Sequence, residues 1–314
     1  MTRPPAPSPC LALAAAAALA LTALAAAPAA AQPPVFGPTE ELHFDEPESW
    51  AMAWFSSVTL LTGFGVPEPL DPGALELGLE GGWVPSLSEE ERRVGFGGTK
   101  VEDLNRVPAI GRPRLTVGLP AGWTLTGAWI PPVEIDDVEP NLFALALGRQ
   151  LWAGDRSRGG LRLYGQTGTV EGAITCTAED AAGGDDPVAN PFGCEAPSDD
   201  ELTLTYYGVE LSVAYRAASG TEPYFAAAVS RFDNEFQVDA ITFGLNDRTL
   251  LLSEGTAWSV AAGVAHPLGE RARLAGEVFY TPLDVRRLTD QNVLGPAETD
   301  ELLNVRLLWS WRLR

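Results

Sequence analysis

The sequence predicts an all-β protein, a transmembrane antiparallel up-and-down β-barrel of about ten strands with a short N-terminal helix. Three observations predict this fold. Apolar residues alternate with polar or small residues in one segment after another. Short and long connections alternate between these segments. The chain also opens with a stretch typical of an export signal.

We expect residues 1–31 to be a secretory signal peptide. Arg3 is the only charged residue in this stretch, an apolar run covers 11–24, and the alanines at 29–31 form a small-residue cleavage site. A transmembrane helix is the alternative interpretation. The alanine-rich apolar run, followed by a cleavage site, favours the signal peptide.

Residues 32–73 form a second segment, which we expect to be a periplasmic or plug segment that contains a helix. Ser49 is a candidate N-cap, and Gly63 and Gly65 are candidate terminators. One face of this helix would carry large apolar side chains at helical spacing, from Trp50, Trp54, Val58 and Leu61. That face needs a partner, so the helix could plug the lumen, lie across the periplasmic mouth or rest on the membrane surface.

The barrel is expected over residues 74–314, and its last strand gives the plainest pattern. Val305, Leu307 and Trp309 share one parity, whereas Arg306 and Arg312 share the other. Successive side chains of a strand point to opposite faces. One face therefore suits lipid and the other suits a polar lumen.

Ten segments follow this period of two and have roughly the 9–11 residues that a tilted membrane strand needs, some of them more. We predict the strands at 74–84, 112–120, 123–131, 140–149, 159–170, 202–217, 222–233, 256–267, 271–281 and 300–313. The long connections are 85–111, 132–139, 171–201, 234–255 and 282–299, and the connection near 150–158 is intermediate. A soluble β-sandwich could also have ten strands, but nothing in it would force short and long connections to alternate.

Aromatic residues near the strand ends suit the interfacial girdles of a membrane barrel. They are Trp83, Trp123, Trp129, Tyr215, Trp258, Tyr280, Trp309 and Trp311.

The formal net charge of −21 argues against a nucleic-acid partner, which would require a basic surface. Many of the acidic residues fall in the long connections. One of these, 171–201, also contains Cys176 and Cys194, which we expect to form a disulfide in an oxidising compartment. The acidic residues around them lack the spacing of a calcium loop, so we expect no metal site and no cofactor.

The parity opposite the apolar face defines the candidate lumen-lining residues. They could pair across a narrow lumen, or they could line a small polar path for a solute. They are Glu76, Glu80, Arg114, Arg162, Tyr164, Glu210, Arg216, Arg273, Glu277, Arg306 and Arg312.

We expect no enzymatic activity and no catalytic residues. Proton transfer in barrel enzymes typically needs a histidine beside an acid or a serine. His43 lies before the first strand and His266 lies in a short turn. Neither is expected to reach the outer rim, and both are interpreted as structural.

The export signal, the alternating strands, the rhythm of short and long connections and the Trp-rich final strand resemble bacterial outer-membrane β-barrel proteins of the porin-like kind. The resemblance covers residues 74–314 and departs from the pattern at the end, because such proteins usually finish on an aromatic residue and this chain ends at Arg314. It implies a location in the cell outer membrane, with outer-membrane lipid, the assembly machinery and a small solute as partners.

Two functions follow as hypotheses from this resemblance. The first is a channel or transporter for a small solute, gated by the N-terminal segment. The second is a non-conducting adhesion or envelope-structural barrel that acts through the disulfide-closed acidic loop.

Overall fold

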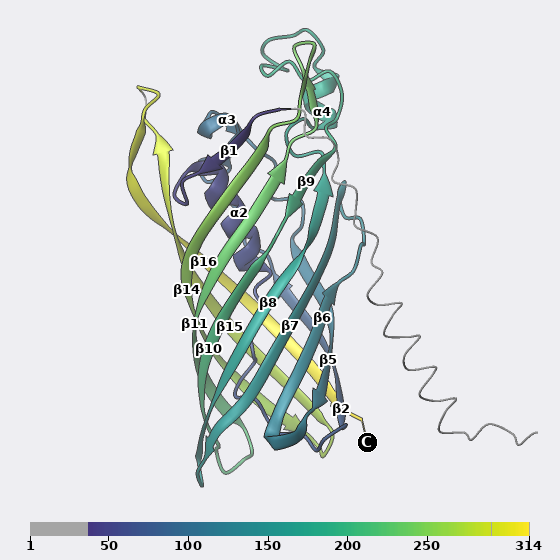
Figure 1. Ribbon diagram of the computed structural model, residues 1–314, viewed down its shortest axis with the longest axis vertical. Helices are drawn as coiled ribbons and strands as arrows, with labels where there is room; N and C mark the ends of the chain where they lie inside the picture. The colour runs from purple at the N-terminus through teal and green to yellow at the C-terminus, as the bar shows by residue number, and fades with distance from the viewer. Residues whose placement is uncertain (1–36, 290, 314) are drawn as a thin grey trace, which may run out of the picture. The chain divides into compact units, whose positions relative to one another are not determined.

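The computed structural model describes residues 37–289 and 291–313, so the predicted signal peptide lies outside the described residues. These residues form a closed antiparallel barrel of 10 strands, as predicted (Figure 1). The barrel strands, in chain order, are β2 (Leu75–Trp83), β5 (Ala109–Gly118), β6 (Trp123–Ile130), β7 (Val138–Ala153), β8 (Ser157–Gly172), β10 (Tyr206–Tyr215), β11 (Glu222–Gln237), β14 (Leu250–Leu268), β15 (Ala272–Leu288) and β16 (Leu294–Arg312).

Neighbouring barrel strands in the chain are also neighbours in the wall, and β16 pairs with β2 to close the barrel. Short turns join the strands at one end. The connections at the other end are longer, apart from the one between β15, which ends at Leu288, and β16, which begins at Leu294. In membrane barrels the long connections face the outside. We call this end the outer end and the opposite end the periplasmic end. The connection near 150–158 is a tight turn at the periplasmic end, between β7 and β8.

The predicted boundaries were too short at the outer end. Strands β11, β14, β15 and β16 run well into the regions 234–255 and 282–299, which were predicted as loops. Their residues pair in regular register, for example Gln237 with Leu250 and Asp284 with Thr299. The polar residues there do not end the strands, because main-chain hydrogen bonds between neighbouring strands do not depend on lipid contact and continue above the membrane.

The outer surface of the barrel carries the apolar parity. Leu303, Val305, Leu307 and Trp309 are exposed on β16, whereas Arg306 between them is completely buried inside. The same outward-facing apolar parity holds on β10, where the exposed residues are Tyr207, Val209, Leu211, Val213 and Tyr215. This apolar belt, bordered by aromatic residues, is what an outer-membrane barrel presents to lipid. Among the described residues, no helix is both long enough and apolar enough to span a membrane.

Short helices and strands lie at the outer end and in the turns. They are β1 (Thr39–Leu42), β3 (Arg93–Val94), α3 (Gly95–Gly98), β4 (Lys100–Val101), η1 (Pro120–Gly122), α4 (Ala178–Ala182), β9 (Asp200–Thr203), β12 (Ala240–Thr242) and β13 (Leu245–Asp247). Strand β9 continues the line of β10 beyond a break, since it pairs with the same neighbours, β8 and β11.

The helix α2 (Pro47–Val58) lies inside the outer half of the barrel (Figure 1). Of the positions that the sequence left open, this is the plug. Two details of the expectation were wrong. The N-cap is Glu46 rather than Ser49, whose hydroxyl lies within the helix and bonds to Phe44 and Ser253. The helix also ends at Val58, so Leu61 follows it.

The helix is buried on nearly every side rather than on one face. Ser49, Met52 and Ser56 lie off the predicted apolar face and are as inaccessible as Trp50 and Trp54. A helix inside a barrel meets the wall all round, so helical periodicity finds the helix but not the extent of its burial.

We predict that Leu307→Arg impairs assembly, because it places a charge on the lipid face at a cost of about 2–4 kcal/mol near the bilayer midplane. The measurement is the fraction of folded barrel, which migrates differently on a gel before and after boiling. Glu301→Arg, on the same face of β16 but beyond the apolar belt, should assemble normally. Equal folding of both variants would contradict the assigned lipid face.

Candidate functional site: the plugged lumen and its outer cap

A segment of the chain runs through the lumen from the outer end to the periplasmic end. Helix α2 occupies the outer half, and residues 59–70, which we call the strap, continue downward to the start of β2. Trp50, Trp54, Val58 and Leu61 are each at most 2% exposed. The lumen is therefore filled by the chain itself.

Arginines on the wall hold the point where the helix becomes the strap. Arg306 on β16 donates to the carbonyl oxygens of Leu60 (2.6 Å), Ser57 (3.0 Å) and Val58 (3.1 Å). Arg112 on β5 donates to those of Thr59 (2.7 Å) and Leu60 (2.9 Å). The last carbonyls of a helix have no partner within it and carry partial negative charge, so cations are favourable there.

The same pattern continues along the strap. Arg114 donates to the carbonyl oxygen of Thr62 (2.9 Å), and Arg273 donates to that of Phe64 (2.6 Å). Arg162 reaches the carbonyl of Leu61 at 3.3 Å. Main-chain carbonyls thus accept hydrogen bonds from arginines on β5, β8, β15 and β16.

Carboxylates neutralise part of this positive charge. Glu80 lies between Arg112 and Arg114 and receives a two-pronged contact from Arg112, at 2.5 and 2.8 Å. Glu210 accepts from Arg162 at 3.0 Å. Such pairing is required, because an isolated charge in this setting is costly.

Further polar residues complete the contacts to the strap. The Tyr206 hydroxyl donates to Thr59 and accepts from the Leu61 amide, and Gln166 donates to the Thr59 hydroxyl. Glu277 contacts both Thr62 and Tyr224. The lumen is therefore a connected polar network around a polypeptide backbone.

The structure places the predicted lumen residues in two groups. Those buried in the network or beside it are Glu80, Arg114, Arg162, Tyr164, Glu210, Glu277 and Arg306. Those nearer the periplasmic end are Glu76, Arg273, Arg216 and Arg312. Arg216 follows the end of β10 and pairs with Glu222 at the rim rather than in the network.

The sequence reasoning missed Arg112, Gln166, Tyr206 and Tyr224. Arg112 shares parity with Arg114, and Tyr206 shares parity with Glu210, so the period of two could have identified both. The binding of arginines to strap carbonyls had no signal in the sequence, because any residue supplies a carbonyl.

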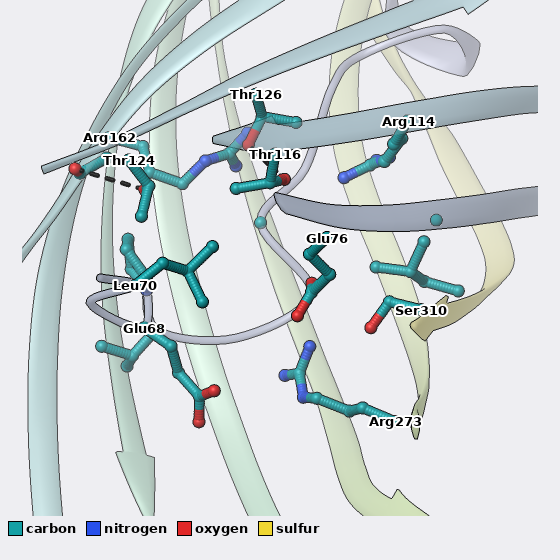
Figure 2. Close-up of a pocket in the computed structure, with 16 residues that line it drawn as sticks. Glu68, Leu70, Glu76, Arg114, Thr116, Thr124, Thr126, Arg162, Arg273 and Ser310 are labelled. Atoms are coloured by element: carbon teal, nitrogen blue, oxygen red, sulfur yellow. Dashed lines mark hydrogen bonds between the residues drawn. The ribbon is translucent and has the colours of Figure 1, made fainter. Parts of the chain in front are cut away.

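Below the network, a polar cavity of about 80 Å³ lies beside the strap (Figure 2). Small side chains on neighbouring strands leave this space, namely Gly78, Thr116, Thr126 and Gly148. Arg114, Arg162, Arg273, Glu68 and Glu76 also line it. Its lining suits water or a small polar solute.

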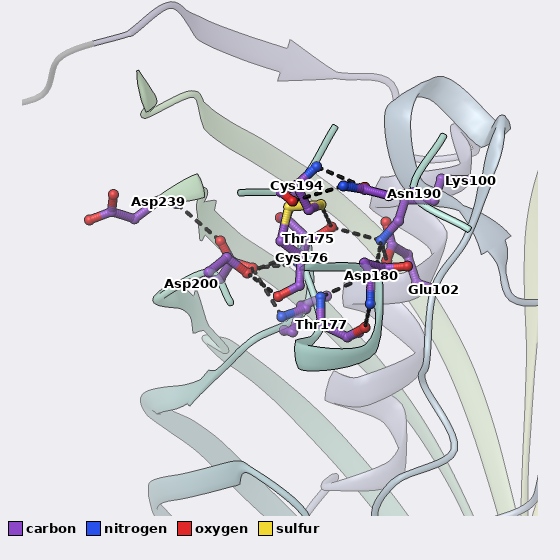
Figure 3. Close-up of a disulfide and its surroundings, with 12 residues drawn as sticks. Lys100, Glu102, Thr175, Cys176, Thr177, Asp180, Asn190, Cys194, Asp200 and Asp239 are labelled. Atoms are coloured by element: carbon purple, nitrogen blue, oxygen red, sulfur yellow. Dashed lines mark hydrogen bonds and ion pairs between the residues drawn. A yellow bond between two sulfur atoms is a disulfide. The ribbon is translucent and has the colours of Figure 1, made fainter. Parts of the chain in front are cut away.

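The outer end is covered by two long connections, 84–108 and 173–199, which we call the outer cap. The predicted disulfide between Cys176 and Cys194 is present and buried in it (Figure 3). Lys100 joins the two connections, since its ammonium donates to Glu102 (2.7 Å) and to the carbonyl of Thr175 (2.7 Å).

Asp200 fixes the base of the disulfide loop. Its carboxylate accepts from the amides of Thr175 (2.6 Å), Ile174 (3.0 Å) and Asp239 (3.0 Å). The cap also touches the plug, because the Gly97 amide donates to the Glu48 side chain on α2. Connection 84–108 of the cap and the plug are therefore in direct contact.

His43 lies at the outer end, contrary to the expectation from the sequence. It follows β1, which pairs in parallel with the outer end of β14, and its Nδ1 lies 2.8 Å from the Asp45 carboxylate. The error arose because the segment before the first barrel strand runs through the lumen instead of staying in the periplasm. His266 lies on the exposed surface near the periplasmic end and contacts Thr221.

No protein-family model matches the sequence, and no curated protein sequence is similar to it. Several solved structures are similar to this chain at low identity and with low TM-scores. The attachment invasion locus protein Ail of Yersinia pestis is 11% identical (TM-score 0.30; 77% of this chain, 100% of that one). The outer-membrane protease OmpT of Escherichia coli is 11% identical (TM-score 0.37; 77% and 94%). The toluene transporter TodX of Pseudomonas putida is 13% identical (TM-score 0.33; 89% and 78%).

These neighbours are bacterial outer-membrane β-barrel proteins. The class assigned to the present chain rests on its own geometry, a closed barrel with an apolar outer belt and a polar, plugged lumen. That geometry defines an outer-membrane β-barrel protein.

The outer cap should loosen as the pH rises. Burial raises the pKa of the Glu102 carboxyl to about 7, although Lys100 partly offsets the rise; Asp180 and Asp200 raise it further. The folded cap thus binds this proton more tightly than an unfolded chain, whose value is 4.5. The stabilisation is complete below the unfolded value and is lost as the pH rises through the folded one.

We therefore expect amide hydrogen exchange in residues 100–102 and 174–176 to accelerate between about pH 5 and about pH 8, after correction for the intrinsic rate. Glu102→Gln should remove this dependence while leaving exchange in the barrel strands unchanged. A dependence that survives in the Gln variant would assign it to another group.

Proposed function

We propose that this outer-membrane barrel admits a small solute when its N-terminal segment moves. The observation that carries the proposal is that the lumen is occupied by residues 47–70, a continuous segment. Its lower end continues covalently into β2, whereas its upper end is held to the wall by non-covalent contacts. A closed wall of paired strands cannot open a passage by itself. Movement of this segment can open such a passage.

The contacts that hold residues 57–64 allow such a movement. The arginines of the wall bind main-chain carbonyls there, and water can replace these hydrogen bonds in a hydrated lumen. The polar cavity beside the strap extends the path toward the periplasm. We expect outer-membrane lipid and the assembly machinery to be the barrel's partners, and we propose no catalytic activity.

A second function, adhesion or envelope structure through the outer cap, is favoured by a different observation. The cap is an ordered structure with its own disulfide, a buried lysine and a stacked pair formed by Phe96 and Phe192 (5.1 Å). Adhesion that depends on the cap should be lost in Cys176→Ser/Cys194→Ser, whereas the plugged lumen should be unaffected.

A disulfide lock tests the gating proposal. The hydroxyls of Ser49 on α2 and Ser253 on β14 lie 2.5 Å apart and are both fully buried, so Ser49→Cys/Ser253→Cys should form a disulfide with little rearrangement. In planar bilayers we expect the locked barrel to lose the opening events of the unaltered protein, and a reductant to restore them.

Each single-cysteine variant is a control, as is the unaltered protein with reductant, whose native disulfide is also reduced. Opening that persists with the lock formed would show that helix α2 does not gate the lumen. Folded barrels that never open, in any variant, would contradict transport and favour the function of the outer cap.

A further inference from the structure

The wall of the barrel is not paired over its whole height. Strand β14 pairs with β15 only from Val260 opposite Tyr280 down to the periplasmic turn. Above this level β14 continues to pair with β11 up to Leu250, and β15 continues to pair with β16 up to Leu288. We call the unpaired outer halves, 250–259 and 281–288, the seam.

Figure 1 shows the outer ends of β15 and β16 leaning away from β14, with β1 and α2 at this side of the barrel. A proline lies near the point where pairing stops. Pro282 has no amide hydrogen to donate to a ladder, and prolines within sheets are confined to edges, strand starts and bulges. Pro282 therefore marks the level at which the pairing of β15 with β14 stops.

The N-terminal segment closes the seam by touching both edges. On one edge, β1 pairs in parallel with Leu250 to Ser253 of β14. On the other edge, the Arg286 amide donates to the Asp45 carbonyl (2.7 Å), and the Arg286 guanidinium pairs with the Asp45 carboxylate (2.8 Å). Residues 39–45 thus replace the missing strand pairing.

A glycine on β14 makes room for this closure. The Phe44 ring lies against Gly255, where a Cβ atom would come within 2.0 Å of the ring. Phe44 also stacks near Phe232 on β11 (6.2 Å between ring centroids). A side chain at position 255 would push the segment away from the wall.

The height of the seam relates it to the membrane surface. Its lower end lies beside Trp258 and Tyr280, whose rings pair on the outside of the barrel (5.8 Å), as in the aromatic girdle at an interface. Just above, Glu254 and Arg231 form an exposed ion pair. Unpaired strand edges are excluded from the hydrocarbon layer, so a seam can begin only where that layer ends.

The space behind the seam is apolar, unlike the lower lumen. Helix α2 presents Trp50 to it, and the wall is lined there by Ala257, Phe279, Leu283 and Val285, all buried in one cluster. A molecule that enters when the N-terminal segment withdraws would contact these apolar side chains in its place. Apolar surface is the chemistry that such a site takes.

We propose that the seam is a lateral portal, through which a small apolar molecule passes between the headgroup region of the outer leaflet and the upper lumen when residues 39–58 withdraw. The inference rests on the proposed function for the movement of the plug. It adds a route through the wall and a chemical class for the solute.

Reactivity of a single cysteine toward a lipid-borne reagent tests the portal. Ala257 lies on the seam, faces inward and is adjacent to Trp258 of the outer girdle. Ala144 on β7 is its matched control, since it also faces inward beside an exposed aromatic residue, Phe143, but lies in a wall that is paired on both sides. The probe is a phospholipid with a maleimide headgroup, and modification is read on the cysteine peptide by mass spectrometry.

We expect Ala257→Cys to be modified roughly tenfold faster than Ala144→Cys, because an unpaired edge opens locally at a lower free energy than a paired one. Phe44→Ala, which removes the ring that fills the seam, should accelerate modification at position 257 and leave position 144 unchanged. If Ala257→Cys fails to fold, Ser253→Cys supplies a second position on the same edge.

Equal rates at positions 257 and 144 would overturn the portal, as would modification of 257 by a small water-soluble maleimide but not by the lipid-borne one. The disulfide lock between α2 and β14 reports on gating separately. If the lock abolishes opening but position 257 reacts no faster than position 144, the gated pore stands and the portal is contradicted. If position 257 reacts faster but no barrel conducts, passage across the membrane is contradicted and the seam is a binding site reached from the lipid side.

Discussion

Positive charge buried in a narrow lumen has to be stabilised by hydrogen bonds as well as by counter-charges, and here the backbone carbonyls of the N-terminal segment supply many of these hydrogen bonds. Arg306 contributes three bonds to carbonyl oxygens at the end of α2, and Arg112 contributes two. A hydrogen bond that involves a charged group contributes about 1.5–3 kcal/mol, and removal of one partner from a buried pair costs about 3–5 kcal/mol. The wall therefore depends on the plug as much as the plug depends on the wall.

The contacts between the wall and the N-terminal segment differ at three levels of the barrel. At the periplasmic end, strands paired on both sides surround a polar cavity and the strap. At the level of Arg306 the network holds the strap to the wall. Above it, helix α2 packs against apolar side chains, and the segment before the helix completes the wall where β14 and β15 part. One displacement of residues 39–58 would thus unplug the upper lumen and open the seam together.

The sequence predicted the barrel well because a strand with lipid on one side and water or charge on the other leaves a period of two. The ten strands, the disulfide and the presence of the helix followed from such local patterns. The path of residues 37–73 did not, because it depends on carbonyl oxygens that every residue carries. His43 was therefore placed at the wrong end. The seam was hidden for the same reason, since alternation shows that β15 is a strand but not where its pairing with β14 stops.

Single-channel conductance of Arg306→Met tests the central claim most directly. Methionine keeps much of the volume but removes the three hydrogen bonds from position 306 to the end of α2, so we expect openings that are more frequent than in the unaltered barrel. Arg216→Met, which removes a rim arginine that pairs with Glu222 and not with the strap, should behave like the unaltered protein. A folded Arg306→Met barrel with unchanged openings would show that the arginine contacts do not hold the plug in place.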